Sequence, residues 1–170
     1  QVSGGAYVSY CGGYGVKSKG SITIKNNSIS DLNSLYSTKT IEKFDTFNVT
    51  VKSLVNNGIL SSGYIEVSLL TTNDAVITSK QYKNTGKGSA SSAAKEDTVN
   101  FTNISSQIKG IQIYFNNADG FSGWAMWDVK LAGTYTESQS EYSLTYNENK
   151  PDGVSAAVGN FPSSPTDKAS

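Results

Sequence analysis

The stretch that decides the fold is Phe44-Asp45-Thr46-Phe47-Asn48-Val49-Thr50-Val51-Lys52-Ser53-Leu54-Val55. From Phe47 to Lys52, apolar and polar side chains alternate strictly. This alternation gives a β-strand one apolar and one polar face. The sequence Asn56-Asn57-Gly58 that follows is typical of a turn. We therefore expect a half-buried strand here, closed by a tight turn.

Similar segments recur along the chain with turn residues between them. The expected strands cover 6–10, 20–25, 44–55, 63–72, 75–82, 98–103, 109–116 and 123–135. Helical periodicity is nearly absent, although the irregular segment 29–36 has room for one short helical turn. The Gly-, Ser-, Ala- and Lys-rich segment 84–95 predicts an exposed loop. Eight or nine strands at about ten-residue spacing predict an all-β fold, an antiparallel β-sandwich of jelly-roll type.

The apolar members of these alternating segments form the predicted core. They are Ile22, Ile24, Phe47, Val49, Val51, Ile65, Val67, Leu69, Val99, Phe101, Ile111, Ile113, Phe115, Trp127, Val129 and Leu131. Because no stretch has the length and pattern of a crossover helix, a parallel α/β fold is excluded.

Charge and composition exclude several classes of function. The 170 residues hold 14 Lys, no Arg and no His against 14 acidic residues, so the net charge is zero. A nucleic-acid-binding protein needs a basic face, which this balance does not favour. Without His, the Ser/His and Cys/His nucleophile systems are absent. No apolar run approaches the ~20 residues of a membrane span, so we expect no membrane insertion.

Catalysis by carboxylates is also not expected. A glycosidase needs two carboxyl groups about 5–10 Å apart across a groove. Glu66 and Asp128 would meet this requirement only by coincidence. The lone Cys11 cannot form an internal disulfide. The sequence therefore predicts a non-enzymatic domain.

Alternation also predicts which side chains face outward. If Ile111 and Phe115 point into the core, Gln112 and Tyr114 point to solvent. The same rule turns Tyr64 and Glu66 outward, since they alternate with core positions.

Two further aromatic residues are expected on the outside under stated conditions. Tyr82 faces outward if Ile77 faces inward, and Trp124 faces outward with Met126, Asp128 and Lys130 if Trp127 faces inward. A one-residue bulge between 124 and 127 would reverse the orientation of the two tryptophans. Exposed aromatic rings in a hydrophilic domain indicate a binding partner.

One known family is similar in its last strands. Phe101 to Phe115, followed by Trp124-Ala-Met-Trp-Asp-Val-Lys-Leu131, resembles the end of the β-sandwich carbohydrate-binding modules of secreted bacterial polysaccharidases. This resemblance implies a non-catalytic module, a monomer within a larger multimodular chain, that targets a secreted glycoside hydrolase to its polysaccharide.

The C-terminal stretch is similar to a second module. Glu141 to Gly153 and Val158 to Ser163 resemble the opening of a Listeria–Bacteroides repeat, which is common in surface and secreted proteins of Gram-positive bacteria. The later half of that repeat is missing. We therefore expect a main domain over 1–136, and a linker with a truncated repeat over 137–170 for which disorder is one expected state. The implied location is secreted or at the bacterial cell surface.

Stacking of sugar rings on aromatic side chains is the expected mode of binding. A flat ring covers the C–H face of a sugar while polar neighbours bond its hydroxyls. The candidate glycan-binding residues are Trp124, Tyr114, Tyr64, Tyr82, Gln112, Glu66 and Asn116. A neutral domain favours a neutral plant polysaccharide, with xylan or a related hemicellulose first, starch second and mucin glycans third. The alternative is an adhesin or structural surface domain without glycan binding.

Three further points stay open. Tyr7, Tyr10 and Tyr14 in the glycine-rich N-terminal run line a cleft or pack in an ordinary edge strand. Modules of the family that this chain resembles often hold one structural calcium. Asp128 and Asp119 are the acidic residues that could bind it here. Calcium needs six to eight oxygens, and the sequence offers few clustered acids, so the expectation is no cofactor or one structural calcium.

Overall fold

The computed structural model describes residues 2–10, 13–25, 30–56, 59, 62–117 and 123–138. Its helices are α1 (Ser30–Thr38) and the 3-10 helix η2 (Ser91–Ala93). Its strands are β1 (Val2–Tyr10), β2 (Gly13–Lys25), β3 (Ile41–Val55), β4 (Tyr64–Leu70), β5 (Val76–Tyr82), β6 (Lys95–Ile104), β7 (Gly110–Asn116) and β8 (Gly123–Glu137). The chain divides into the units Gln1–Ser138 and Gln139–Ser170. The predicted truncated repeat lies outside the described residues.

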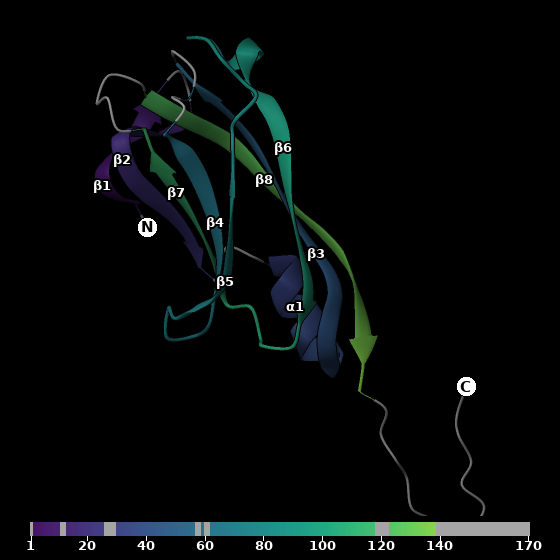
Figure 1. Ribbon diagram of the computed structural model, residues 1–170. Coiled ribbons are helices and arrows are strands. Elements are labelled where there is room, and N and C mark those ends of the chain that lie inside the picture. Colours follow the sequence, from purple (N-terminus) through teal and green to yellow (C-terminus); the bar gives the residue numbers. More distant parts are fainter. Residues whose placement is uncertain are drawn as a thin grey trace, which may run out of the picture. The chain divides into compact units, whose positions relative to one another are not determined.

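The strands form an antiparallel β-sandwich, so the predicted all-β fold of jelly-roll type is confirmed. The hydrogen-bonded order is β5-β4-β7-β2-β8-β3-β6, and β1 pairs with β2. Most neighbours in this order are not consecutive in sequence. The connections therefore cross between the two layers, which Figure 1 shows side by side.

Strand β2 belongs to both layers. Its C-terminal part, 19–25, pairs with β7, whereas its N-terminal part, 14–17, pairs with β8. The strands β7 and β8 then diverge, β7 toward β4 and β5, and β8 toward β3 and β6. One continuous ladder thus bends into two sheets that enclose a core.

The core contains most of the side chains that alternation predicts. The buried ones are Ile22, Phe47, Val49, Val51, Ile65, Val67, Leu69, Val99, Phe101, Ile111, Ile113 and Phe115. Ile24, Val129 and Leu131 are partly buried and pack against this core. The prediction that Trp127 belongs to the core is wrong, because its side chain is half-buried and lies outside the buried set.

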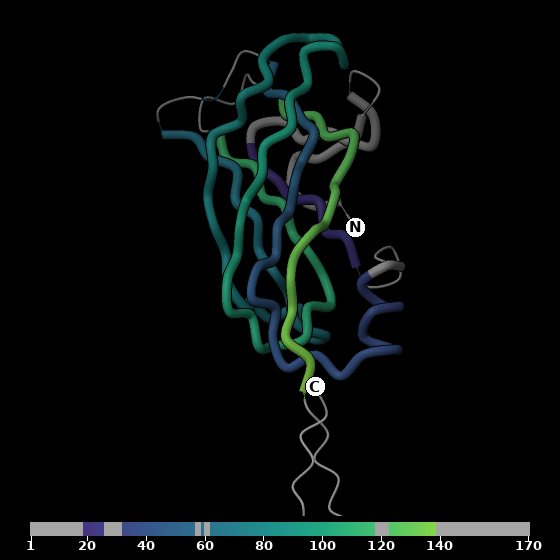
Figure 2. Tube along the Cα trace, turned by 90° about the vertical axis from the view of Figure 1, so that its right-hand side faces the viewer, coloured from purple at the N-terminus to yellow at the C-terminus, as the bar shows by residue number. Residues whose placement is uncertain are grey.

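The helix α1 is longer than the short turn that the sequence predicts. Leu32, Leu35 and Tyr36 have the spacing of one helix face and pack on the core. The Tyr36 hydroxyl accepts a 2.9 Å hydrogen bond from the Ile108 backbone N–H, and burial raises the pKa of this phenol. Figures 1 and 2 place α1 at the end of the sandwich where β3 begins and β8 ends. Within the described residues, no helix combines the length and apolar character needed to cross a membrane.

Lys80 joins the two layers at their edge strands, β5 in one layer and β6 in the other. Strands β5 and β6 end the hydrogen-bonded order, so each has one unpaired side. From β5, Lys80 Nζ donates a 2.7 Å hydrogen bond to the Asn100 carbonyl of β6 and lies 5.8 Å from the centre of the Phe101 ring. This contact satisfies an edge carbonyl that would otherwise be free to pair with another strand.

Candidate functional site

The outer face of the β5-β4-β7 layer brings together five of the residues that the sequence singles out. Tyr64 lies opposite Asn116, Glu66 opposite Tyr114, and Ser68 opposite Gln112. Their neighbours in β4 and β7 are core residues, which turns these side chains away from the core. We call the set Tyr64, Glu66, Gln81, Gln112, Tyr114 and Asn116 the tyrosine face.

The two tyrosines of this face form an aromatic pair. Tyr64 and Tyr114 occupy diagonal positions on adjacent strands, with ring centres 6.2 Å apart and planes inclined at 58°. Both side chains are half-buried. Because each ring is partly supported by its neighbour, the pair presents aromatic surface in a defined orientation.

Polar groups surround the aromatic pair. Gln81 Nε2 donates a 3.0 Å hydrogen bond to Glu66 Oε2, and Gln112 Nε2 donates to Thr23 Oγ1 at 3.3 Å. Asn116 Oδ1 is buried and has no hydrogen-bond partner among the described residues. The face therefore has amide and carboxylate groups beside the two rings.

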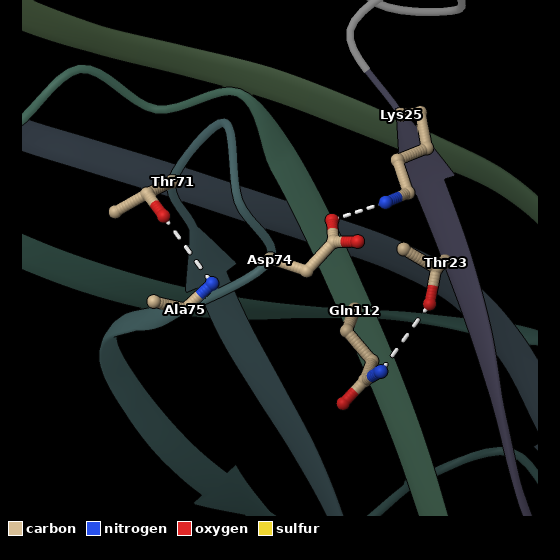
Figure 3. Close-up of polar contacts among 6 residues, drawn as sticks. All are labelled: Thr23, Lys25, Thr71, Asp74, Ala75 and Gln112. Carbon is tan, nitrogen blue, oxygen red and sulfur yellow. Dashed lines mark hydrogen bonds and ion pairs between the residues drawn. The ribbon is translucent and has the colours of Figure 1, made fainter.

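An ion pair closes one end of this layer. Lys25 of β2 pairs with Asp74 in the turn between β4 and β5 (Figure 3). In the same turn the Ala75 N–H donates to Thr71 Oγ1 at 3.2 Å, and Asp74 adopts a positive φ of 60°. Short polar residues tolerate this conformation, which lets the chain reverse tightly.

Gln81 is a residue of this face that sequence reasoning missed. It lies on β5 directly opposite Glu66. Simple alternation from Ile77 would turn Gln81 inward. Only the register of β5 against β4 places Gln81 on this face, and the sequence does not reveal that register.

The prediction that Trp124 points outward is wrong. Its side chain is 0% exposed and stacks on Phe115, with ring centres 6.1 Å apart and planes inclined at 17°. The cause is a bulge in β8, since Lys52 pairs with Asp128 but Ser53 pairs with Met126. Trp127 is the extra residue of this bulge. The residues that precede it in β8, Trp124 among them, therefore face the side opposite to the one that alternation from Trp127 predicts.

Met126, which was also expected outside, is therefore buried, while Asp128 and Lys130 beyond the bulge are exposed as expected. Trp124 offers no ring face to a ligand in this structure.

The prediction that Tyr82 faces outward is also wrong, because its side chain faces the core. Leu69 pairs with Thr78 and Leu70 with Val76, so Ile77 is an extra residue in β5. Beyond this bulge, Tyr82 lies opposite the core residue Ile65 and packs against the core. Burial raises the pKa of the Tyr82 phenol well above its ordinary value. Tyr82 therefore supports the sandwich from within.

No metal site is evident in the described part of the chain. These residues contain no group of three or more His, Cys, Asp or Glu side chains that could hold an ion. Asp128 is exposed and lies opposite Lys52. Asp119 and the side chains of Tyr7, Tyr10 and Tyr14 lie outside the described residues. The structural calcium stays a prediction.

The outer face of the β8-β3-β6 layer has a different character. Its outward residues include Lys52, Thr102 and Asp128. We give the name threonine face to eight further outward residues, Thr46, Asn48, Thr50, Glu96, Thr98, Asn100, Lys130 and Thr134. Matching side chains meet across the strands. The hydroxyls of Thr50 and Thr98 are 2.8 Å apart, and Asn100 donates to Asn48.

The remaining members of the threonine face pair in the same way. The hydroxyls of Thr46 and Thr134 lie 2.9 Å apart, and Lys130 Nζ lies 2.6 Å from Glu96 Oε1. This contact lowers the pKa of Glu96 and raises the pKa of Lys130. Polar groups on this face therefore bond mainly to one another.

Comparison with solved structures gives a likeness in fold. No protein-family model and no curated protein matches this chain. A solved structure described as "CBM4 structure and function" is similar, with a TM-score of 0.43 and 13% sequence identity. The similarity covers 79% of this chain and 77% of that chain. CBM denotes a carbohydrate-binding module.

Proposed function

We propose that this domain is a non-catalytic module that binds a neutral polysaccharide on its tyrosine face. The observation that carries the proposal is the pair Tyr64 and Tyr114 on an outer sheet face, with rings 6.2 Å apart and polar groups beside them. The flat C–H face of a sugar ring packs on such rings. Glu66 and Gln112 supply hydrogen bonds to hydroxyls at its rim, and Asn116, whose Oδ1 is buried, adds its Nδ2 as a donor.

The shape of this face favours an internal segment of a chain. The side chains follow two neighbouring strands across a sheet surface, which gives contacts to several successive sugars. A neutral domain without Arg favours an uncharged polymer. We propose xylan or a related plant hemicellulose as the first ligand and starch as the second. In this function the domain would hold a secreted, multimodular glycoside hydrolase on its substrate.

Affinity gel electrophoresis tests the proposal. The parent protein is run in gels that contain xylan, mannan, β-glucan or starch, and at least one polymer is expected to retard it. Tyr114→Ala should lose most of this retardation, whereas Thr98→Ala on the threonine face should migrate as the parent does. Release of reducing sugar is expected to be undetectable.

Two results would contradict the proposal. Retardation that Tyr114→Ala leaves unchanged would place the binding surface elsewhere. A parent protein that no polymer retards would favour the alternative, an adhesin or structural domain. Retardation that is lost between low and moderate salt would also favour this alternative, because it would indicate a charged partner.

A further inference from the structure

Glu66 lies beside the aromatic surface that the proposed function uses. In the ladder between β4 and β7 it is directly opposite Tyr114. Side chains of directly opposed residues on one sheet face have Cβ atoms about 4.5–5.5 Å apart. A sugar ring that stacks on Tyr114 therefore has one rim next to the Glu66 carboxylate.

The Glu66 carboxylate is held in place from its other side. Gln81 on β5 is its ladder partner, and the Gln81 amide donates to Oε2 at 3.0 Å. No other hydrogen bond to Glu66 occurs within the described residues, so Oε1 keeps its capacity to accept. The arrangement orients one carboxylate oxygen and leaves the second one available.

Glu66 also has no ion-pair partner among the described residues. The ion pairs of the described residues involve Asp74, Glu137, Asp45 and Glu96, and none involves Glu66. The cation Lys19, which pairs in the ladder with Asn116, lies on β2, two strands away from β4. No ion pair among the described residues therefore neutralises the negative charge at the rim of Tyr114. Lys83, the cation that follows Tyr82 on the chain, directs its Nζ to the Gly63 carbonyl.

We propose that Glu66 selects the class of sugar that can stack on Tyr114, an inference that rests on the proposed function. An ionised carboxylate only accepts hydrogen bonds, and a sugar hydroxyl can donate to it. Such charge-assisted bonds are stronger than neutral ones. A uronic acid brings a second carboxylate, which cannot donate and has the same sign. The site thus takes uncharged sugars with hydroxyls at that rim and rejects uronates, and Gln81 acts as a positioning residue.

The experiment compares neutral and acidic forms of one backbone. Each polymer that retards the parent protein is run beside its carboxylate-bearing form: glucuronoxylan beside arabinoxylan, or β-glucan or starch oxidised at C6 beside the untreated polymer. The parent is expected to bind the neutral form more tightly. Glu66→Gln keeps the size of the side chain and removes its charge, so we expect this preference to fall several-fold. Gln81→Ala should reduce the preference less.

A matched control and a salt series complete the test. Glu96→Gln removes a carboxylate from the threonine face and should leave the preference as in the parent. Because the discrimination is electrostatic, higher salt should shrink it in the parent and leave Glu66→Gln nearly unchanged. The salt series on the parent protein alone tests the role of Glu66 even if a substitution impairs folding.

The outcomes separate this inference from the proposed function. If Tyr114→Ala abolishes binding but Glu66→Gln retains the parental preference, the role of Glu66 is wrong and the proposed function stands. A preference in the parent that salt does not change also overturns the role of Glu66. Parental binding by Tyr114→Ala, or no retardation of the parent by any polymer, overturns both.

Discussion

The two outer faces of the sandwich share one architecture and differ in how their polar groups are used. On the threonine face, side chains in register bond to each other, as in the pairs Thr50–Thr98 and Thr46–Thr134. On the tyrosine face, two aromatic rings interrupt the polar rows, and one oxygen of the Glu66 carboxylate has no hydrogen-bond partner among the described residues. A face whose groups saturate one another has less to offer a ligand than a face whose groups do not.

This difference does not arise from the backbone. Both faces belong to antiparallel ladders with the same alternation of inward and outward residues. Only the residue types at the outward positions differ. A few outward side chains, on a scaffold that both faces share, therefore distinguish the candidate site from the opposite face.

The largest expected effect concerns the core behind the tyrosine face. Trp124→Ala removes a fully buried ring that stacks on Phe115, and it should destabilise the fold by about 3–5 kcal/mol. Trp127→Ala, at the half-buried bulge, should cost much less. Urea unfolding of both variants measures this difference. If Trp127→Ala proves the more costly change, the assignment of the bulge is wrong.

The next effect concerns binding by the tyrosine face itself. Tyr64→Ala should weaken polysaccharide binding by about 1–2 kcal/mol, or roughly tenfold, because an aromatic stacking surface is lost. Tyr64→Phe keeps the ring and should bind nearly as the parent does. Retardation in affinity gels gives the measurement. Equal losses for the two variants would show that the hydroxyl, and not the ring face, makes the contact.

A smaller effect is expected on the threonine face. A double-mutant cycle with Thr50→Val and Thr98→Val should give a coupling energy of about 0.2–1 kcal/mol, since the two hydroxyls bond across the strands. Binding of polysaccharide should not change in any member of the cycle. A change in binding would break the contrast between the two faces.

The smallest effect is the pH dependence contributed by Glu96. Its pKa is lowered in the folded state by Lys130, so its stabilising contribution is present above the unfolded pKa and is lost as the pH falls through the folded pKa. Glu96→Gln should therefore lose less stability than the parent between pH 7 and pH 3. Thermal melts at the two pH values measure this. An identical loss in both proteins would show that the exposed pair contributes nothing.

The sequence predicts the fold and part of the site because alternation survives in unbroken strands. In β4 and β7 the pairing is one to one, so Glu66 and Tyr114 follow directly from their apolar neighbours. The core side chains of β3 follow by the same rule. Most strand positions agree because turn residues separate the alternating segments. An exception is β2, which begins at Gly13, inside the glycine-rich run, and not at Gly20.

The two errors in the candidate site have one physical cause. Trp124 is oriented from Trp127 and Tyr82 from Ile77, and each of these reference residues is itself the extra residue of a one-residue bulge. A bulge shifts the alternation by one and turns later side chains to the opposite face. Neither Ile77 nor Trp127 is a Gly or Pro that would signal a bulge in the sequence. The helix α1 was underestimated, although the spacing of Leu32, Leu35 and Tyr36 indicates it.

The contact from Lys80 to the Asn100 carbonyl has a consequence for how copies of this domain meet. The unpaired sides of β5 and β6 are the places where another chain could add a strand. Because a charged ammonium group occupies an acceptor on β6, an incoming strand would have to displace and desolvate it before pairing. At this position of β6, strand addition thus carries a desolvation cost set by the same side chain that joins the two layers.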